Sequence, residues 1–261
     1  FLQNTGTFKL RGAYASIMSL DNEQLSNGVI AVSAGNHAIA VAYAAKSYNV
    51  KAKVVMPKSS NKFRVSACEE LGADVIFAEN SSDAFEKVTL IKERENLSFI
   101  HPFEGQNIVN GTATLGYEIC NQLPDMSALI IPIGGGGLCS GVSAFVRRVN
   151  PKCSIYGVEP IAANTMYRSL KENAPQSIDN IKTMADSLAA PSAMPVSFEY
   201  CKTNIDSSHL VSEKEISIAM NILFDEMNLA VEPACAVSTA ALLGPLRTEV
   251  DGKTIVLILC G

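Results

Sequence analysis

The sequence has few charged residues and no run of basic ones. Of its 261 residues, 18% are Asp, Glu, Lys or Arg, and the formal net charge is −5. Because binding to nucleic-acid phosphates needs a basic surface, we expect no nucleic-acid partner. With 48% hydrophobic residues, the chain can bury a large core, which excludes intrinsic disorder.

Cysteine pairs with zinc-site or disulfide spacing are also absent. The seven cysteines are scattered, and no two of them form a CxxC pair. Most lie within apolar runs, as reduced thiols in a protein core do, so we expect a reducing, cytoplasmic location. The sequence has no signal-peptide pattern and does not begin with Met, and we expect both ends to be truncated.

One uncharged stretch is long enough to cross a bilayer. From Ser127 to Val146, 20 residues contain no charge, but five of them are glycine and one is proline. Such a composition disfavours a lipid-exposed helix, because glycine weakens helices and leaves the backbone poorly packed. We therefore predict a buried strand, a glycine loop and a helix here, and no membrane span.

Short β-rich runs alternate with helix-compatible segments along the whole chain. The predicted strands are Gly28–Ser33, Lys53–Pro57, Asp74–Ala78, Leu97–His101, Ala128–Ile133, Ser154–Val158 and Thr254–Leu259. The predicted helices are Asn36–Tyr48, Lys62–Leu71, Ser81–Asn96, Leu138–Val149, Ser212–Asn228 and Ala236–Thr248. Residues 162–208 are expected to be rich in loops because prolines interrupt them. The pattern predicts an α/β fold with two open, mainly parallel twisted sheets, helices on both faces, and a site at the strand ends.

Four consecutive glycines, Gly134–Gly137, form the strongest local signal. They follow a predicted buried strand and precede a helix, where bare backbone N–H groups can bind an anion. The spacing does not match GxGxxG, because Cys139 or Ser140 stands where the third glycine would. Glu159, at the end of the next strand, imitates a ribose-binding acid, so a nucleotide-binding domain stays an alternative. A tight turn without a ligand stays open too.

Three further features are weaker when taken alone. Ser33–His37 (SAGNH) also joins a strand to a helix, and its N–H groups could bind a carboxylate or belong to an ordinary helix start. Lys9, within TGTFKLRGA, could be a solvated surface charge. Cys260 ends a predicted buried strand, where a core thiol is the simplest interpretation.

In combination, TGTFKLRGA, SAGNHA, GGGGL and the strand ending in Cys-Gly resemble one family in their order and spacing. This is the fold-type II family of pyridoxal-phosphate (PLP) enzymes, with the tryptophan synthase β-like fold, and the similarity lies with its threonine/serine dehydratase and serine racemase branch. The resemblance covers residues 1–261. It implies a large PLP-binding domain of residues 1–22 and 105–261, with a small domain of residues 23–104 inserted in it.

The resemblance also implies roles for individual residues. Lys9 matches the Schiff-base lysine and acts as the catalytic base, and Phe8 lies beside it under the cofactor ring. The other cofactor-binding positions are Asn36, Gly134, Gly135, Gly136, Gly137, Leu138, Glu232 and Cys260, the last facing the pyridine nitrogen. The resemblance also implies that the substrate carboxylate is bound by the loop of Ser33, Ala34, Gly35, Asn36 and His37.

Two positions select among the activities of the family. Ala34 stands where the racemases have a serine that acts as acid and base on the face opposite the lysine, so racemisation is disfavoured. Glu159 and the Ala163 carbonyl match a cation site of the racemases, but Thr165 replaces its carboxylate, and we expect no metal.

The expected reaction is therefore a PLP-dependent β-elimination by a threonine/serine ammonia-lyase. A small β-hydroxy amino acid such as L-threonine or L-serine loses water, and hydrolysis of the released enamine then gives a 2-oxo acid and ammonia. Ile39-Ala40 and Ser187 depart from the family pattern, so the exact substrate stays open, including a hydroxy amino acid from hydroxyectoine breakdown. A racemase and a catalytically silent PLP-binding relative remain alternatives, and the chain could form a homodimer or homotetramer.

Overall fold

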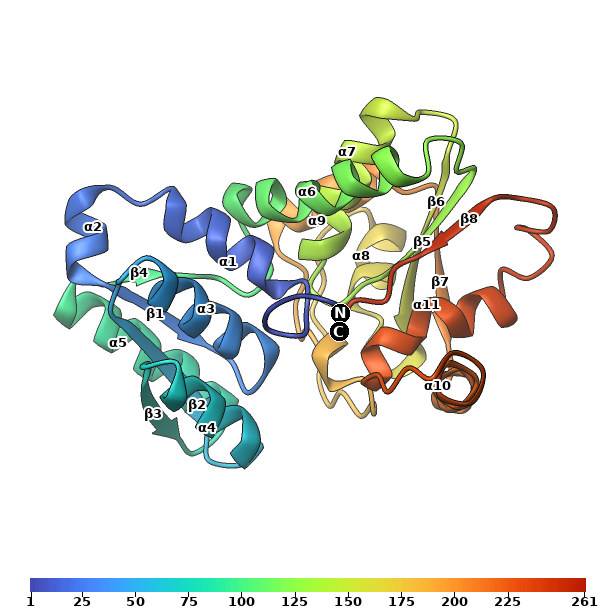
Figure 1. Ribbon diagram of the computed structural model, residues 1–261. Helices are drawn as coiled ribbons and strands as arrows, with labels where there is room; N and C mark the ends of the chain where they lie inside the picture. The colour runs from blue at the N-terminus through green and yellow to red at the C-terminus, as the bar shows by residue number, and fades with distance from the viewer. The chain divides into compact units, whose positions relative to one another are not determined.

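The chain divides into two units, each with its own parallel sheet. The computed structural model describes the backbone of residues 1–261 and every side chain except that of Ser81. Residues Leu2–Pro102 form the N-terminal unit, and Phe1 with Phe103–Gly261 forms the C-terminal unit (Figure 1). Each sheet has four strands that are all parallel, so the predicted fold class is confirmed.

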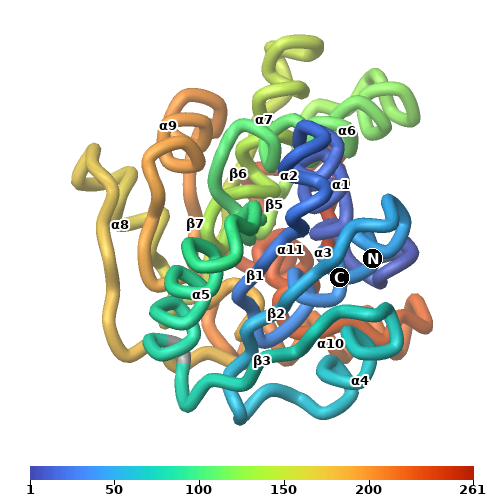
Figure 2. The backbone as a smooth tube through the Cα atoms, turned by 90° about the vertical axis from the view of Figure 1, so that its left-hand side faces the viewer, coloured from blue at the N-terminus to red at the C-terminus, as the bar shows by residue number. Residues whose placement is uncertain are grey.

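In the N-terminal unit the strand order is β3-β2-β1-β4. The strands are β1 (Val29–Val32), β2 (Ala52–Pro57), β3 (Asp74–Ala78) and β4 (Ser98–Phe99), and the helices are α1 (Lys9–Met18), α2 (Asn22–Asn27), α3 (Asn36–Ser47), α4 (Lys62–Glu70) and α5 (Ser81–Glu95). Both faces of the sheet are covered by helices, and Figure 2 shows α5 on the side away from α3 and α4.

Alternate residues of the central strand β1 supply both hydrophobic cores of this unit. Val29 and Ala31 face α1 and the alanine-rich α3, while Ile30 and Val32 face α5. A strand buried on both faces must be apolar at every position, which explains the uninterrupted sequence VIAV.

The C-terminal unit has the strand order β7-β6-β5-β8. Its strands are β5 (Ala128–Pro132), β6 (Ser154–Pro160), β7 (Ser207–Val211) and β8 (Ile255–Leu257), and its helices are α6 (Gln106–Gln122), α7 (Gly137–Val149), α8 (Thr165–Glu172), α9 (Pro195–Asn204), α10 (Glu213–Met227) and α11 (Pro233–Leu243). Helices α10 and α11 pack on one face of the sheet, and α6, α7 and α9 lie on the other (Figure 1).

Several predicted boundaries need correction. Residues 162–208 are rich in loops as predicted, but the sequence pattern missed α8, α9 and the first residues of β7, which lie within them. Pro195 does not break α9 but occupies its first turn, where the missing N–H costs nothing. Pro233 begins α11 in the same way, so this helix starts and ends earlier than the sequence pattern predicts.

The predicted domain boundaries stay a prediction. The contact pattern differs from them at residues 2–22, which belong to the N-terminal unit because Leu10, Ala13 and Ile17 of α1 are part of its core. The uncharged stretch from Ser127 to Val146 forms β5, the glycine loop and most of α7, as predicted. None of the helices in the described residues is long and apolar enough to span a membrane.

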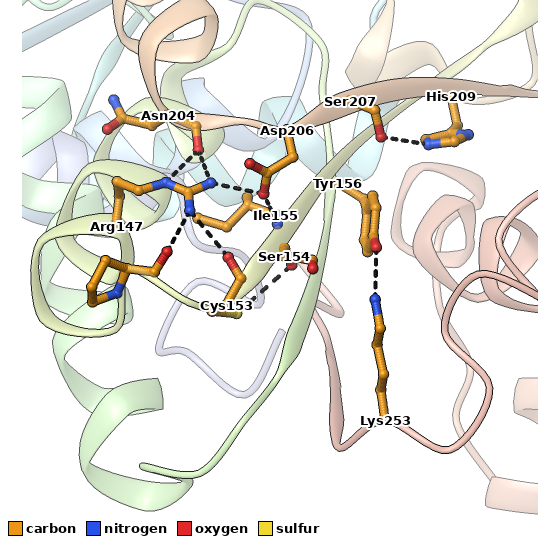
Figure 3. A network of polar contacts seen from close by, with 11 residues as sticks. Arg147, Cys153, Ser154, Ile155, Tyr156, Asn204, Asp206, Ser207, His209 and Lys253 are labelled. Carbon is orange, nitrogen blue, oxygen red and sulfur yellow. Dashed lines mark hydrogen bonds and ion pairs between the residues drawn. The ribbon is translucent and has the colours of Figure 1, made fainter.

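A polar network joins the ends of α7 and α9 to the start of β6 (Figure 3). The Arg147 guanidinium donates to the carbonyls of Asn204, Pro151 and Cys153 and pairs with the Asp206 carboxylate at 2.8 Å. Asp206 also accepts a 2.7 Å bond from the Ile155 N–H. One side chain thus satisfies three carbonyls at the amino-terminal edge of the sheet.

Replacing Arg147 with alanine should lower the free energy of unfolding by about 2 kcal/mol, because it leaves several carbonyls without their donor. Urea denaturation measures the loss. The neighbouring Arg148 is exposed, and Arg148→Ala serves as the control, with a change within about 0.5 kcal/mol. Equal effects of the two substitutions would contradict this account of the network.

Candidate active site

Each sheet reverses its strand order at one point, and the predicted site residues collect there. In the N-terminal unit, β1 lies between β2 and β4, so the segments after β1 and β4 leave the carboxyl edge side by side. In the C-terminal unit, β5 lies between β6 and β8 in the same way. Open parallel sheets bind their ligands at such switch points.

Lys9 lies at the switch point of the N-terminal unit. It is the first residue of α1, and its Nζ donates a 2.6 Å hydrogen bond to the carbonyl of Pro102, just beyond β4. Nζ also lies 5.1 Å from the centre of the Phe8 ring, so Phe8 is beside the lysine as predicted.

His37 is buried behind this lysine. Its Nε2 lies 2.8 Å from the Ile100 carbonyl, which can only accept, so Nε2 carries the proton. Burial, together with the charge of Lys9, lowers the pKa of His37 to about 3, so the ring is neutral. The imidazole therefore fixes the segment that holds Lys9, and only the backbone of His37 is left for a substrate carboxylate.

The rest of the SAGNH loop is shaped by small residues. Ser33 Oγ accepts a 3.1 Å bond from the Gly35 N–H, and Asn36 begins α3. A Cβ on Gly35 would lie 2.7 Å from an Arg64 Nη1 atom, so the guanidinium of Arg64 on α4 lies directly against the loop. Sequence reasoning missed Arg64, because an arginine within a helix carries no signal of its own. Ala34, by contrast, supplies no hydroxyl.

In the C-terminal unit, the glycine loop is tightly enclosed by other parts of the chain. A Cβ on Gly135 would lie 2.2 Å from the Phe103 ring, and one on Gly137 would lie 2.7 Å from the Phe103 carbonyl oxygen. A Cβ on Gly134 would meet the backbone of Leu188 at 2.9 Å. Gly136 has a positive φ of 92°, a conformation that favours glycine. Four glycines are therefore needed for packing as well as for the turn.

The same loop presents unpaired donors. Among the described residues, no acceptor meets the backbone N–H groups of Gly134 to Leu138, and the last two of these open α7. Bare N–H groups at the positive end of a helix suit a phosphate. The loop thus fits the phosphate of PLP, and the nearby absence of Cβ atoms permits close approach.

Cys260 follows β8, beside the glycine loop in the strand order. Its thiol is buried and lies 3.8 Å from the Ala234 carbonyl at the start of α11, the helix that Glu232 precedes. The neighbouring thiol of Cys235 and burial together raise the pKa of Cys260 well above its ordinary value. Cys260 is therefore a neutral thiol, as a weak partner for a pyridine nitrogen should be.

The residues around Glu159 are committed to protein contacts. Its carboxylate accepts bonds of 2.9 and 2.5 Å from the N–H groups of Met166 and Tyr167 at the start of α8. The Thr165 hydroxyl donates to the Ala190 carbonyl at 2.7 Å. Burial raises the pKa of Glu159 to about 8, against the opposing effect of the two N–H groups. Within the described residues, no cluster of three His, Cys, Asp or Glu side chains could hold a metal.

Comparison with known proteins defines the class. The chain matches the family "Pyridoxal-phosphate dependent enzyme" over residues 1–261, and it belongs to this family. A phenylserine dehydratase from Ralstonia pickettii is 47% identical over 100% of this chain and 80% of its own length. An L-threonine ammonia-lyase from Thermotoga maritima is 37% identical over 100% of this chain, which spans 65% of that relative, less than two thirds.

Solved structures agree with this placement. The processed form of threonine deaminase isoform 2 from Solanum lycopersicum is 36% identical, with a TM-score of 0.96 over 100% of this chain and 76% of that one. Maize serine racemase is 30% identical, with a TM-score of 0.96 over 100% of this chain and 80% of that one. The predicted family, fold type and PLP cofactor are confirmed by these matches.

The buried, neutral His37 should make the stability of the protein depend on pH. Its pKa of about 3 in the folded protein lies below the ordinary value of 6.5, so the unfolded chain binds the extra proton between these values. Stability from this group is complete above pH 6.5 and falls as the pH drops toward 3.

Between pH 7 and pH 5, the wild type should lose about 2 kcal/mol of unfolding free energy through His37 alone. Urea denaturation of wild type and His37→Gln at both pH values isolates this contribution, because other titrating groups are common to both proteins. An equal pH dependence in the two proteins would show that His37 is not held neutral.

Proposed function

We propose that this protein is a PLP-dependent ammonia-lyase that dehydrates a small β-hydroxy amino acid to a 2-oxo acid and ammonia. The observation that carries the proposal is the position of Lys9, whose Nζ donates to the neutral Pro102 carbonyl beside a neutral imidazole. The names of the relatives, phenylserine dehydratase and L-threonine ammonia-lyase, support this reaction class.

The predicted site residues would bind different parts of the cofactor and the substrate. Gly134–Leu138 would hold the cofactor phosphate through their N–H groups, and Phe8, Asn36 and Glu232 would border its ring. The backbone of Ser33–His37 would bind the substrate carboxylate at the start of α3. PLP, when bound, supplies the electron sink that makes a Cα proton removable.

In the proposed reaction, a side chain of the protein removes the proton from the substrate. The amine of Lys9 takes the Cα proton at Nζ, which requires its neutral form. The neutral thiol of Cys260 cannot fully protonate a pyridine nitrogen, as a carboxylic acid would. This restraint favours loss of the β-hydroxyl as water over transamination.

The size of the substrate side chain distinguishes the candidate substrates. L-Threonine and L-serine fit the family, and the phenylserine dehydratase relative raises a β-aryl serine as a second candidate. A panel of L-threonine, L-serine, L-threo-3-phenylserine and a hydroxyectoine-derived acid, scored for 2-oxo acid, decides among them. We also propose a cytoplasmic location, which the seven free thiols support. The assembly of the chain as a dimer or tetramer stays a prediction.

Replacing Lys9 with alanine should abolish the visible absorbance that the protein acquires with PLP and slow turnover at least about 10³-fold, because the covalent anchor and base are lost. Lys58→Ala is the control, since Lys58 is exposed and forms an ion pair with Glu79. Wild-type absorbance and turnover in the Lys9 variant would refute the assignment.

The racemase alternative makes a separate prediction at Ala34. Without an acid on the second face of the substrate, the wild type should release 2-oxo acid and no detectable D-isomer. Ala34→Ser restores a hydroxyl and should introduce D-isomer formation, measured by chiral chromatography. Formation of the D-isomer by the wild type at the rate of 2-oxo acid would favour the racemase.

A further inference from the structure

Helix α9 lacks a cap from its own sequence. The residue before it, Met194, has no side-chain acceptor, and Pro195 occupies the first position. The next two N–H groups, of Val196 and Ser197, would be left without acceptors at the helix start. A remote carboxylate, that of Glu104, accepts both of them, at 2.7 and 3.0 Å.

Glu104 makes a third bond to the same helix. Its Oε2 accepts the Ser197 hydroxyl at 2.8 Å, so one carboxylate oxygen takes two bonds from Ser197 and the other takes the Val196 N–H. Ser197 is 1% exposed. Its position is therefore set by Glu104 within a closely packed region.

The start of α9 forms one wall of the glycine loop. A Cβ on Gly136 would lie 3.1 Å from the Ser197 Cβ and 3.4 Å from the Cys201 Sγ. Ser140 on α7 donates to the carbonyls of both Gly136 and Ser197, at 2.8 and 3.3 Å. Any displacement of the first turn of α9 is thus transmitted to Gly136.

The residue next to Glu104 covers the same loop from another direction. Phe103 lies against Gly135 and Gly137. The two-residue segment Phe103-Glu104 therefore contacts the loop directly and also fixes the helix that supports it.

We infer that Glu104 is a positioning residue for phosphate binding, acting through α9 and Ser197 on the glycine loop. The inference rests on the proposed function, in which this loop holds the phosphate of PLP. The carboxylate of Glu104 binds the start of α9, and in this way it holds the glycine loop in the conformation that binds phosphate. Its negative charge would by itself repel the phosphate.

The test compares two isosteric substitutions in the full-length protein. Glu104→Gln replaces one acceptor oxygen with an NH2 group, so the N–H group of either Val196 or Ser197 loses its acceptor. Asp206→Asn is the matched control: Asp206 also accepts a backbone N–H and contacts Arg147, but at the amino-terminal edge of the sheet. The dissociation constants of PLP and of pyridoxal, which has no phosphate, are measured for each apoprotein.

We expect Glu104→Gln to raise the PLP dissociation constant about tenfold and that of pyridoxal less than twofold, because only the phosphate contacts are disturbed. Asp206→Asn should leave both constants within twofold of wild type, with a comparable loss of thermal stability. Amide exchange of residues 134–138 in the apoprotein should rise in the Glu104 variant alone. Turnover at saturating PLP should stay within threefold of wild type.

Other outcomes distinguish a failure of the positioning role of Glu104 from a failure of the proposed function. If wild type prefers PLP strongly over pyridoxal and Glu104→Gln keeps that preference, the positioning role is refuted and the proposed function stands. Equal weakening of PLP and pyridoxal, or an equal effect of Asp206→Asn, would also overturn the inference. If the wild type shows no preference for PLP, the assignment of the loop to phosphate fails.

Discussion

Four consecutive positions without a side chain determine how the C-terminal unit is built. Phe103, Leu188 and the residues of α8 and α9 approach Gly134–Gly137 so closely that a Cβ on any of the four would lie within 3 Å of another atom. This close packing sets the direction in which α7 leaves β5. It also leaves the N–H groups at the start of α7 without acceptors, which is the property that a phosphate site needs.

The N-terminal unit holds Lys9 against the segment that follows β4. Pro102 accepts a hydrogen bond from Lys9, and burial and the charge of Lys9 keep His37 neutral against the opposing effect of its bond to Ile100. The protonated histidine would place a second cation near Lys9 and disturb the segment after β4. Covalent attachment to an aldehyde and base catalysis both require the neutral amine of a lysine.

Local patterns predicted much of this arrangement. The alternation of strands and helices defines the fold class, and glycines placed between a buried strand and a helix mark the glycine loop as the candidate phosphate site without reference to distant residues. The contacts that shape the loop could not be predicted, because Phe103 and Glu104 reach it only through tertiary packing. Helix α9 was missed for the same reason: its cap comes from Glu104, so Met194 and Pro195 carry no start signal. The SAGNH motif singled out His37, but nothing local reveals that its imidazole binds Ile100.

Covalent attachment of PLP to Lys9 is the central claim of this account. Reduction of the PLP-loaded protein with borohydride, followed by proteolysis and mass spectrometry, locates the lysine that carries the pyridoxyl group. We predict the label on the peptide that contains Lys9, and on no other lysine in stoichiometric amount. A stoichiometric label on a different lysine, or a PLP-saturated protein that takes up no label, would contradict the account.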